Sequence, residues 1–151
     1  MEFMSRAVTI FFPNGKKKNQ NVPQTEAWNT IVDLIYPEIK PGSIVTLSGP
    51  LGAGKTTCVQ HLAKALGAKK PAQSPTFALM RIIPVHDRAN GITRLIHVDA
   101  YRIENEEELR VLDLDEELAD GKSICVLEWP ENVPSWIQKK QSHHIAIQIS
   151  I

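Results

Sequence analysis

The sequence predicts an α/β fold in which a mostly parallel sheet carries helices on both faces and an inserted antiparallel hairpin. Three observations lead to this expectation. Short apolar runs rich in β-branched residues are separated by amphipathic segments of helical periodicity. A glycine-rich segment, 49–54, joins one such run to one such helix. A turn-rich segment, 86–91, separates two further runs in the manner of a hairpin.

Size and charge limit the possible architectures and partners. The chain has 151 residues, and its 17 Lys and Arg residues balance 17 Asp and Glu residues. This length is sufficient for a substantial core, so we expect a single domain over residues 1–151. A formal net charge of zero argues against nucleic-acid binding through a general basic field, although a local basic patch remains possible.

The N-terminal segment predicts a strand, a turn and a helix. Residues 6–12 form the expected strand, which ends at the turn 13–15. The basic run 16–18 predicts a solvated hairpin turn, with contact to RNA or to an acidic partner as the alternative. Thr25 is the expected N-cap of the helix, and Pro37 ends it. The apolar face of this helix comprises Ala27, Trp28, Ile31, Leu34 and Ile35.

Residues 49–57, Gly-Pro-Leu-Gly-Ala-Gly-Lys-Thr-Thr, match the nucleoside-triphosphate phosphate loop G-x-x-x-x-G-K-[ST] at every fixed position. A strand is predicted before it at 43–48 and a helix after it at 55–66, which is the setting that such a loop requires. Its backbone amides would form an anion nest at the helix N-terminus. Lys55 would contact the outer phosphates, and the Thr56 hydroxyl would bind Mg²⁺. We therefore expect a P-loop NTPase-like fold that binds ATP or GTP, rather than a glycine-rich turn without a ligand.

The second half of the chain completes the predicted sheet. The two hairpin strands are expected at 77–85 and 92–98. After Asp99 the chain becomes acidic with interleaved leucines, which predicts one or two short amphipathic helices that end at Gly121. The remaining expected elements are a strand at 123–127, a short helix or loop around 136–137, and a last strand at 144–151.

Two acidic residues follow predicted strands and are candidates for Mg²⁺ chemistry. Asp99 would bind the metal directly or through water, unless it is a surface residue that closes a strand. Glu128 would orient the attacking water or share the metal, unless it is a structural acid. Thr76 lies in a proline-bracketed segment that the γ-phosphate and its metal could order, with a simple Ser-Pro turn as the alternative. Trp129 is either a core residue or a base-stacking one, and Arg102 contacts either phosphate or the acidic segment.

The two cysteines, Cys58 and Cys125, have no metal-site or disulfide spacing, so we expect buried reduced thiols. No stretch has the length of a membrane span, and the N-terminus does not resemble a signal peptide. These features predict a soluble cytoplasmic protein.

Four motifs in this order resemble the TsaE (YjeE) family over nearly the whole chain. They are Leu51-Gly52-Ala53-Gly54-Lys55-Thr56-Thr57, Ser74-Pro75-Thr76-Phe77, His97-Val98-Asp99-Ala100-Tyr101-Arg102 and Glu128-Trp129-Pro130. That family comprises the bacterial ATPases of tRNA threonylcarbamoyladenosine biosynthesis. The resemblance implies a subunit that binds Mg-ATP and docks on TsaB and TsaD. TsaD modifies the adenosine at position 37 of ANN-reading tRNAs, and ATP hydrolysis resets the complex between turnovers.

The resemblance also implies roles for individual residues. Thr56 and Glu128 would bind Mg²⁺, Asp99 and Thr76 would belong to the shell of the metal and the γ-phosphate, and Thr25 and Trp129 would lie near the nucleotide. The predicted nucleotide-binding residues are thus Thr25, Gly49, Leu51, Gly52, Ala53, Gly54, Lys55, Thr56, Thr57, Thr76 and Trp129. The predicted catalytic residues are Lys55, Asp99 and Glu128, and the predicted metal ligands are Thr56, Asp99 and Glu128.

One position departs from the family pattern, since Pro50 stands where an acidic residue is common. Proline removes an amide donor, but other phosphate loops carry it there, so nucleotide binding should survive while a partner contact is in doubt. The main alternative function is a small-molecule kinase, although the acidic region after Asp99 offers few basic residues for a phosphoryl clamp. A GTPase lacks support because no Asn-Lys-x-Asp sequence occurs. A binding module that is ordered by nucleotide without functional hydrolysis is the third possibility.

Overall fold

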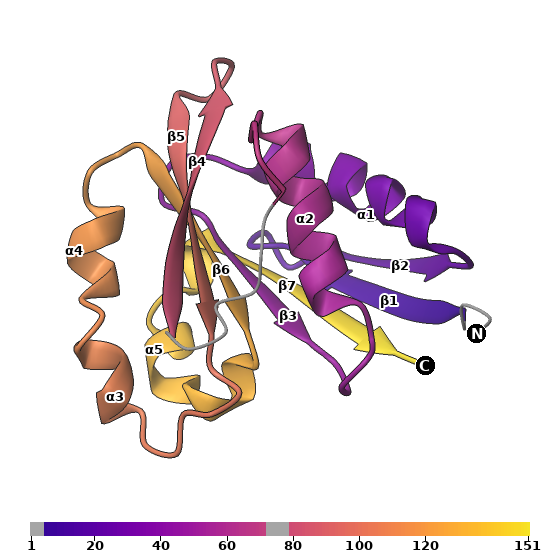
Figure 1. The fold of residues 1–151 in the computed structure, drawn as a ribbon. Coiled ribbons are helices and arrows are strands. Elements are labelled where there is room, and N and C mark those ends of the chain that lie inside the picture. Colours follow the sequence, from indigo (N-terminus) through magenta and orange to yellow (C-terminus); the bar gives the residue numbers. More distant parts are fainter. Residues whose placement is uncertain (1–4, 72–78) are drawn as a thin grey trace.

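The computed structural model describes residues 5–71 and 79–151, and a seven-stranded sheet runs through it (Figure 1). The strands are β1 (Arg6–Phe11), β2 (Lys17–Val22), β3 (Ile44–Ser48), β4 (Met80–Asp87), β5 (Ile92–Asp99), β6 (Ser123–Glu128) and β7 (His144–Ser150). The α-helices are α1 (Trp28–Ile35), α2 (Lys55–Ala65), α3 (Glu107–Arg110), α4 (Leu114–Leu118) and α5 (Pro134–Gln138). Short 3₁₀ turns are η1 (Thr25–Ala27), η2 (Tyr36–Glu38), η3 (Pro130–Asn132) and η4 (Gln141–His143).

The sheet is mixed, and its strand order is β2-β1-β7-β3-β6-β5-β4. The four central strands, from β7 to β5, are parallel to their neighbours within this group. The edges are antiparallel, because β1 pairs with β2 and β7 in this sense and β4 pairs with β5. The predicted inserted hairpin is confirmed as β4–β5. The expectation of a mostly parallel sheet is corrected, since a second antiparallel hairpin lies at the opposite edge.

That second hairpin contains the one strand that the sequence pattern did not predict, β2. Asn14-Gly15 form the expected turn, with the Asn14 side chain accepting a hydrogen bond from the Lys16 amide at 2.9 Å. Lys17 and Lys18, predicted to be part of the turn, begin β2 instead. Only Val22 of this strand is fully buried. A polar, lysine-bearing edge strand has no alternating apolar pattern, and it protects the sheet edge from unwanted pairing.

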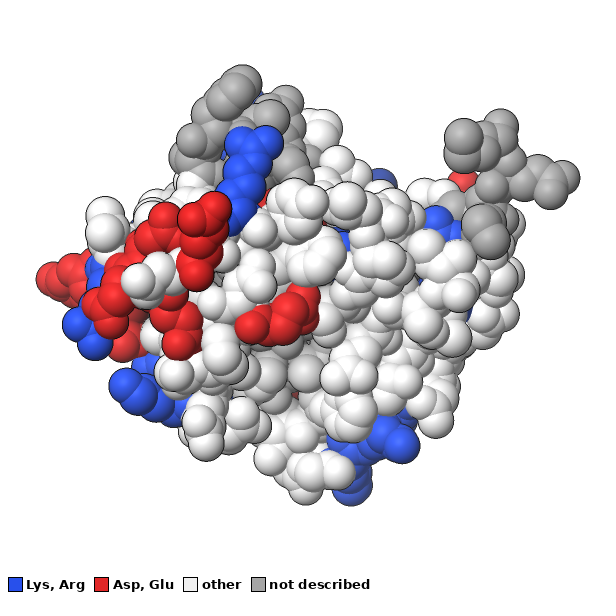
Figure 2. Space-filling model, turned by 90° about the horizontal axis from the view of Figure 1, so that it is seen from below, with Lys and Arg blue, Asp and Glu red and all other residues white. Residues whose placement is uncertain are grey.

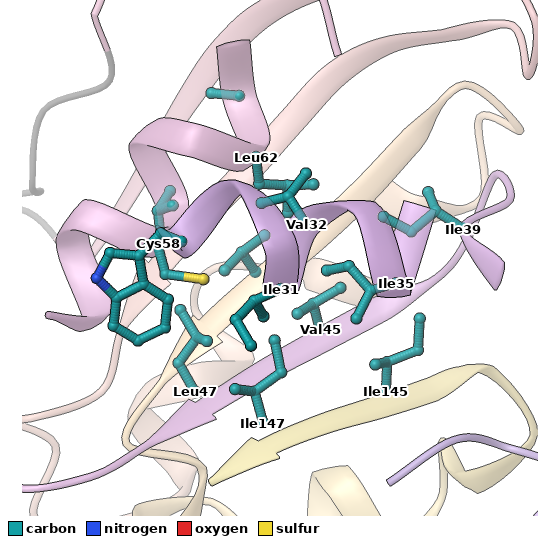
Figure 3. Packing of buried hydrophobic residues seen from close by; sticks show 14 of the residues in the cluster. Ile31, Val32, Ile35, Ile39, Val45, Leu47, Cys58, Leu62, Ile145 and Ile147 are labelled. Atoms are coloured by element: carbon teal, nitrogen blue, oxygen red, sulfur yellow. The ribbon is translucent and has the colours of Figure 1, made fainter. Parts of the chain in front are cut away.

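Helices cover both faces of the sheet, as predicted. On one face, α1 and α2 pack against the central strands; Figure 3 shows Ile31 and Ile35 of α1 and Cys58 and Leu62 of α2 pointing toward Val45 of β3. On the other face, α3, α4 and α5 supply the buried side chains. Side chains alternate along each strand, so Ile124 and Val126 of β6 face α1 and α2, whereas Cys125 and Leu127 face α3 to α5.

The start of the first helix differs from the expectation. Thr25 is exposed and is the first residue of η1, and no side-chain hydrogen bond caps either η1 or α1. Thr25 is therefore not the N-cap; the backbone closes this turn by itself, with the Ala27 amide donating to the Gln24 carbonyl at 3.0 Å. The helix ends at Ile35 and the chain tightens into η2 at Pro37, in agreement with the predicted stop.

Both cysteines are free and buried, as expected. Within residues 5–71 and 79–151, no helix has the length and apolar character needed to cross a membrane.

Candidate functional site

The glycine-rich loop, residues 49–54, connects β3 to α2 and is closely packed on two sides. A Cβ atom added to Gly49 would lie 2.9 Å from the Ile149 carbonyl oxygen of β7. Gly54 has φ +100°, and an added Cβ would lie 2.9 Å from Cζ2 of the buried Trp28 ring. Glycine is required at these two positions because the backbone lies against β7 and the indole, and at Gly54 it also needs a left-handed conformation. The motif is therefore explained by the packing of this fold as well as by ligand chemistry.

Lys55, the first residue of α2, folds its side chain over this loop. Its Nζ donates to the Gly49 carbonyl at 2.6 Å and to the Pro50 carbonyl at 2.9 Å. The same ammonium lies 4.4 Å from the centroid of the Trp129 ring, which is a cation–π contact. Burial lowers the pKa of Lys55, and the negative charges of Glu128, Glu131 and Asp99 oppose that shift. The Lys55 ammonium therefore contacts both the loop and the Trp129 ring, and the charges of the three carboxylates act on it.

Asp99 and Glu128 are neighbours at the carboxyl ends of β5 and β6. They are register partners in the parallel pairing, and the Ala100 amide donates to the Glu128 carbonyl at 3.0 Å. By strand alternation both side chains are on the face that carries α2. Burial raises the pKa of Asp99, an effect that the hydrogen bond from the Tyr101 amide to Oδ1 (3.0 Å) partly offsets and the charge of Glu128 strengthens. The sequence-predicted acids are thus brought together beside the start of α2.

Glu128 has a buried partner that the sequence analysis did not identify, His97. Nε2 of His97 lies 2.7 Å from Oε2 of Glu128, and the two residues are 0% and 3% exposed. The imidazole N–H donates to the carboxylate, and no partner is found for Nδ1 among the described residues. The spacing of two between His97 and Asp99 on one strand was the available signal, because it puts both side chains on the face of Glu128.

Trp129 follows Glu128 in a left-handed conformation, with φ +62° and ψ +53°. Its amide donates to the Leu47 carbonyl at 3.1 Å, which ties the end of β6 to β3, and its ring lies 5.0 Å from the Tyr101 ring. A non-glycine residue in this region costs roughly 1 kcal/mol or more, so the surrounding contacts must compensate for the strain. In this conformation the indole lies over Lys55 and also packs against the hydrophobic cluster on the α3–α5 face.

Arg6 of β1 also reaches the glycine-rich loop, a contact that no sequence pattern indicated. Its Nε donates to the Ala53 carbonyl and its Nη2 to the Gly52 carbonyl, each at 3.0 Å. Arg6 lies 46 positions before Gly52 and 47 positions before Ala53, so the contact depends on the tertiary fold alone.

The other predicted site residues divide into three groups. Thr56 and Thr57 are partly buried in the first turn of α2, directly after Lys55. Leu51 is 67% exposed at the tip of the loop, and Thr25 is exposed in η1, three residues before the indole that packs on Gly54. Thr76 lies outside the described residues.

The donor atoms at the site suit a hard divalent cation. A threonine hydroxyl and two carboxylates are oxygen ligands of the type that Mg²⁺ accepts together with waters and phosphate oxygens. Within the described part of the chain, no cluster of three or more His, Cys, Asp and Glu side chains could hold a metal by protein ligands alone. These oxygen donors would suit a divalent ion that phosphate oxygens and waters also coordinate.

A cleft of about 480 Å³ lies elsewhere, between α3, α4 and α5, and contains none of the predicted site residues. Its carboxylates already serve structural contacts: Glu106 accepts the Trp136 amide at the start of α5, and Asp115 pairs with Lys140 at 2.7 Å. Figure 2, which views the molecule from below, shows acidic side chains gathered on the left, where α3 and α4 lie in Figure 1. We take the loop and the strand ends as the candidate site, because Lys55 contacts Trp129 there and the charges of Asp99 and Glu128 act on it.

Comparisons with known proteins identify a family for this chain. The family model "Threonylcarbamoyl adenosine biosynthesis protein TsaE" matches residues 22–151. The curated "tRNA threonylcarbamoyladenosine biosynthesis protein TsaE" of Bacillus subtilis strain 168 is 37% identical over 114 residues, which is 76% of this chain and 65% of that protein. The protein of the same name from Mycobacterium tuberculosis H37Rv is 34% identical over 125 residues, or 79% of this chain and 72% of that protein.

The Streptomyces coelicolor protein of this name is 44% identical over 94 residues, covering 62% of this chain and 60% of that protein. The matched region thus spans roughly two thirds of the length of these relatives. The crystal structure of Bacillus subtilis YdiB superposes with a TM-score of 0.54 at 26% identity, over 89% of this chain and 72% of that one. On the match of the family model and the identity to these relatives, the chain belongs to the TsaE family of tRNA threonylcarbamoyladenosine biosynthesis proteins.

Proposed function

We propose that this protein is a P-loop ATPase subunit that binds Mg-ATP, hydrolyses it slowly, and works with TsaB and TsaD in the cytoplasm to modify adenosine 37 of tRNA. The observation that carries the proposal is the convergence of Lys55, Asp99 and Glu128 at the carboxyl ends of β3, β5 and β6. Ligands of open α/β sheets bind at such strand ends. Membership of the TsaE family supports the tRNA pathway.

The residues have separable tasks in this proposal. The loop amides and Lys55 bind the phosphates, and Thr56, Asp99 and Glu128 hold Mg²⁺ directly or through water. The ion, when bound, neutralises charge on the phosphate oxygens. Glu128 orients the attacking water, and His97 restricts the carboxylate through the 2.7 Å hydrogen bond. Trp129 shields the ammonium of Lys55 from solvent.

We also propose that the isolated protein hydrolyses ATP slowly, because the site lacks a second positive charge for the γ-phosphate among the groups that act on Lys55 in the described part of the chain. The groups that affect its pKa by their charge are three carboxylates, those of Glu128, Glu131 and Asp99. Phosphoryl transfer in this enzyme class gains several orders of magnitude from an additional cation near the γ-phosphate. We propose that the partner subunits supply that charge or bring it into position.

Phosphate release by the purified chain tests the proposal, measured alone and with TsaB and TsaD. We expect slow release alone and faster release with both partners. A non-hydrolysable ATP analogue should support binding to the partners but not repeated tRNA modification. Vigorous turnover by the chain alone would contradict the need for partners. Phosphorylation of an added metabolite would indicate a kinase, and repeated modification with the analogue would indicate a binding module.

A pull-down from cell extract tests the partners independently of hydrolysis. Recovery of TsaB and TsaD in the presence of Mg-ATP is the expected result. A Lys55→Ala variant should recover less of both partners. The matched control is Lys64→Ala, which changes a lysine at the other end of the same helix. Equal recovery by all three proteins would show that nucleotide does not govern the association.

A further inference from the structure

We propose that Arg6 is a positioning residue that holds the glycine-rich loop in its phosphate-binding conformation. The inference rests on the proposed function, because it concerns how the same loop binds a nucleotide. It adds a contribution from β1, which lies before residues 22–151, the part of the chain that matches the family model.

The Arg6 side chain clamps the loop through two hydrogen bonds from one guanidinium group. Arg6 is only 8% exposed, and its guanidinium spans two consecutive carbonyl groups of the loop, with Nε to Ala53 O and Nη2 to Gly52 O at 3.0 Å each. Two parallel donors on one rigid plane fix the orientation of both carbonyls at once, which a lysine ammonium does not do. The backbone of Arg6 is itself held by its antiparallel pairing with Val22 of β2. The clamp is therefore attached to the sheet rather than to the loop.

Fixing the carbonyls also fixes the amides. The carbonyl of Gly52 shares a peptide unit with the amide of Ala53, and the carbonyl of Ala53 shares one with the amide of Gly54. No described peptide bond is cis, so each N–H points opposite to its carbonyl. Arg6 thus holds the carbonyls toward β1 and the amides away from it. A charged donor also polarises the peptide groups that it binds. This strengthens the Ala53 amide in its turn-closing hydrogen bond to the Pro50 carbonyl, and it strengthens the Gly54 amide as a donor to an anion.

Other contacts make the loop dependent on this clamp. The Ala53 amide closes a turn on the Pro50 carbonyl at 3.1 Å, and the Pro50 carbonyl also accepts Lys55 Nζ at 2.9 Å. Gly54 lies against the Trp28 ring on the opposite side. A loss of the guanidinium would leave the buried Ala53 carbonyl without this donor and would also release the carbonyl of the more exposed Gly52, so the turn would rotate to rehydrate them.

The test compares Arg6→Ala and Arg6→Lys with Arg94→Ala in the full chain. Arg94 is the matched control, since it forms ion pairs with Glu117 and with Asp120 (2.8 Å) beside α4 and touches no loop residue among these contacts. Affinity is measured for Mg-ATP, for Mg-ADP and for pyrophosphate, and amide hydrogen exchange of the 49–57 peptide is measured without ligand. Thermal unfolding of each variant reports the loss of stability separately.

We expect Arg6→Ala to bind all three phosphate ligands at least about tenfold more weakly and to exchange the loop amides faster. Arg6→Lys should recover little of the affinity, because it keeps the charge and loses the two-pronged geometry. Arg94→Ala should lose stability while keeping affinity and loop exchange at the wild-type level. Equal affinity of Arg6→Ala and the wild type, or equal losses in Arg6→Ala and Arg94→Ala, would overturn the inference. A wild-type protein that binds none of the three ligands would overturn the proposed function instead, and the inference with it.

Discussion

Substituting alanine for Gly54 tests the packing of the glycine-rich loop without any assumption about its ligand. An alanine there must adopt φ near +100°, at a cost of about 1–2 kcal/mol. Its Cβ would also lie 2.9 Å from Cζ2 and 3.1 Å from Nε1 of Trp28, whose ring is fully buried and cannot move into solvent. Overpacking of this type costs about 1–3 kcal/mol more. We therefore expect Gly54→Ala to lower the free energy of unfolding by roughly 2–5 kcal/mol.

Gly42 provides the control, because it has φ +90° and nothing within 4 Å of an added Cβ. Gly42→Ala should lose only the conformational part, about 1–2 kcal/mol. The free energies of unfolding are compared by urea denaturation without nucleotide, and the difference between the two variants isolates the clash with Trp28. Replacing Trp28 with leucine should remove most of that difference in a double-mutant cycle. Equal losses in the two glycine variants would refute the argument that Trp28 supports the loop.

Three further predictions concern the chemistry of the site and the core. Lys55→Ala should weaken Mg-ATP binding by about a hundredfold or more in calorimetric titration, because it removes the cation that reaches the phosphates, whereas Lys64→Ala should bind normally. Glu128→Gln should slow partner-stimulated phosphate release at least about tenfold while changing urea stability little, since the amide keeps an oxygen for the hydrogen bond from the imidazole; unchanged release would remove this carboxylate from the mechanism. Burial raises the pKa of Cys58 and Cys125 to about 12 from 9.0, so between these values the unfolded chain releases thiol protons that the folded chain retains. The free energy of unfolding should therefore fall as pH rises above 9.0. At pH 8, a thiol reagent should label both cysteines only at the rate of unfolding. Rapid labelling of the native protein would contradict the burial of these thiols.

The sequence predicted those elements whose signals are local. The strand, glycine-rich loop and helix of residues 43–66 were recovered almost to the residue, because apolar periodicity and glycine spacing determine them without distant contacts. The hairpin β4–β5 and the acidic helices α3 and α4 were recovered for the same reason. β2 was missed because its sequence, Lys-Lys-Asn-Gln-Asn-Val, is polar on both faces and so has no alternating pattern. This edge strand forms through its pairing with β1 rather than through burial of its side chains.

The candidate site shows the same division between local and distant information. Asp99 and Glu128 were predicted from their positions after apolar runs, and parallel pairing then brings them side by side. His97 and Arg6 were not predicted, because each acts through a residue at least thirty positions away, 31 for Glu128 and 47 for Ala53. Thr25 was assigned as a cap from residue preference alone, and the backbone satisfied that turn without its hydroxyl.

The strand order has a consequence for the sequence of events in folding. β7 lies between β1 and β3, and Ser150 Oγ donates to the Ala7 carbonyl across 143 positions of the chain. During synthesis from the N-terminus, the β1–β2 hairpin and the β3–α2 unit are made early, but the strand that pairs with both β1 and β3 is β7, which emerges later. Contacts of such long sequence separation form slowly. The set of pairings that holds β1, and with it Arg6, beside the loop is therefore complete only after β7 has joined both β1 and β3.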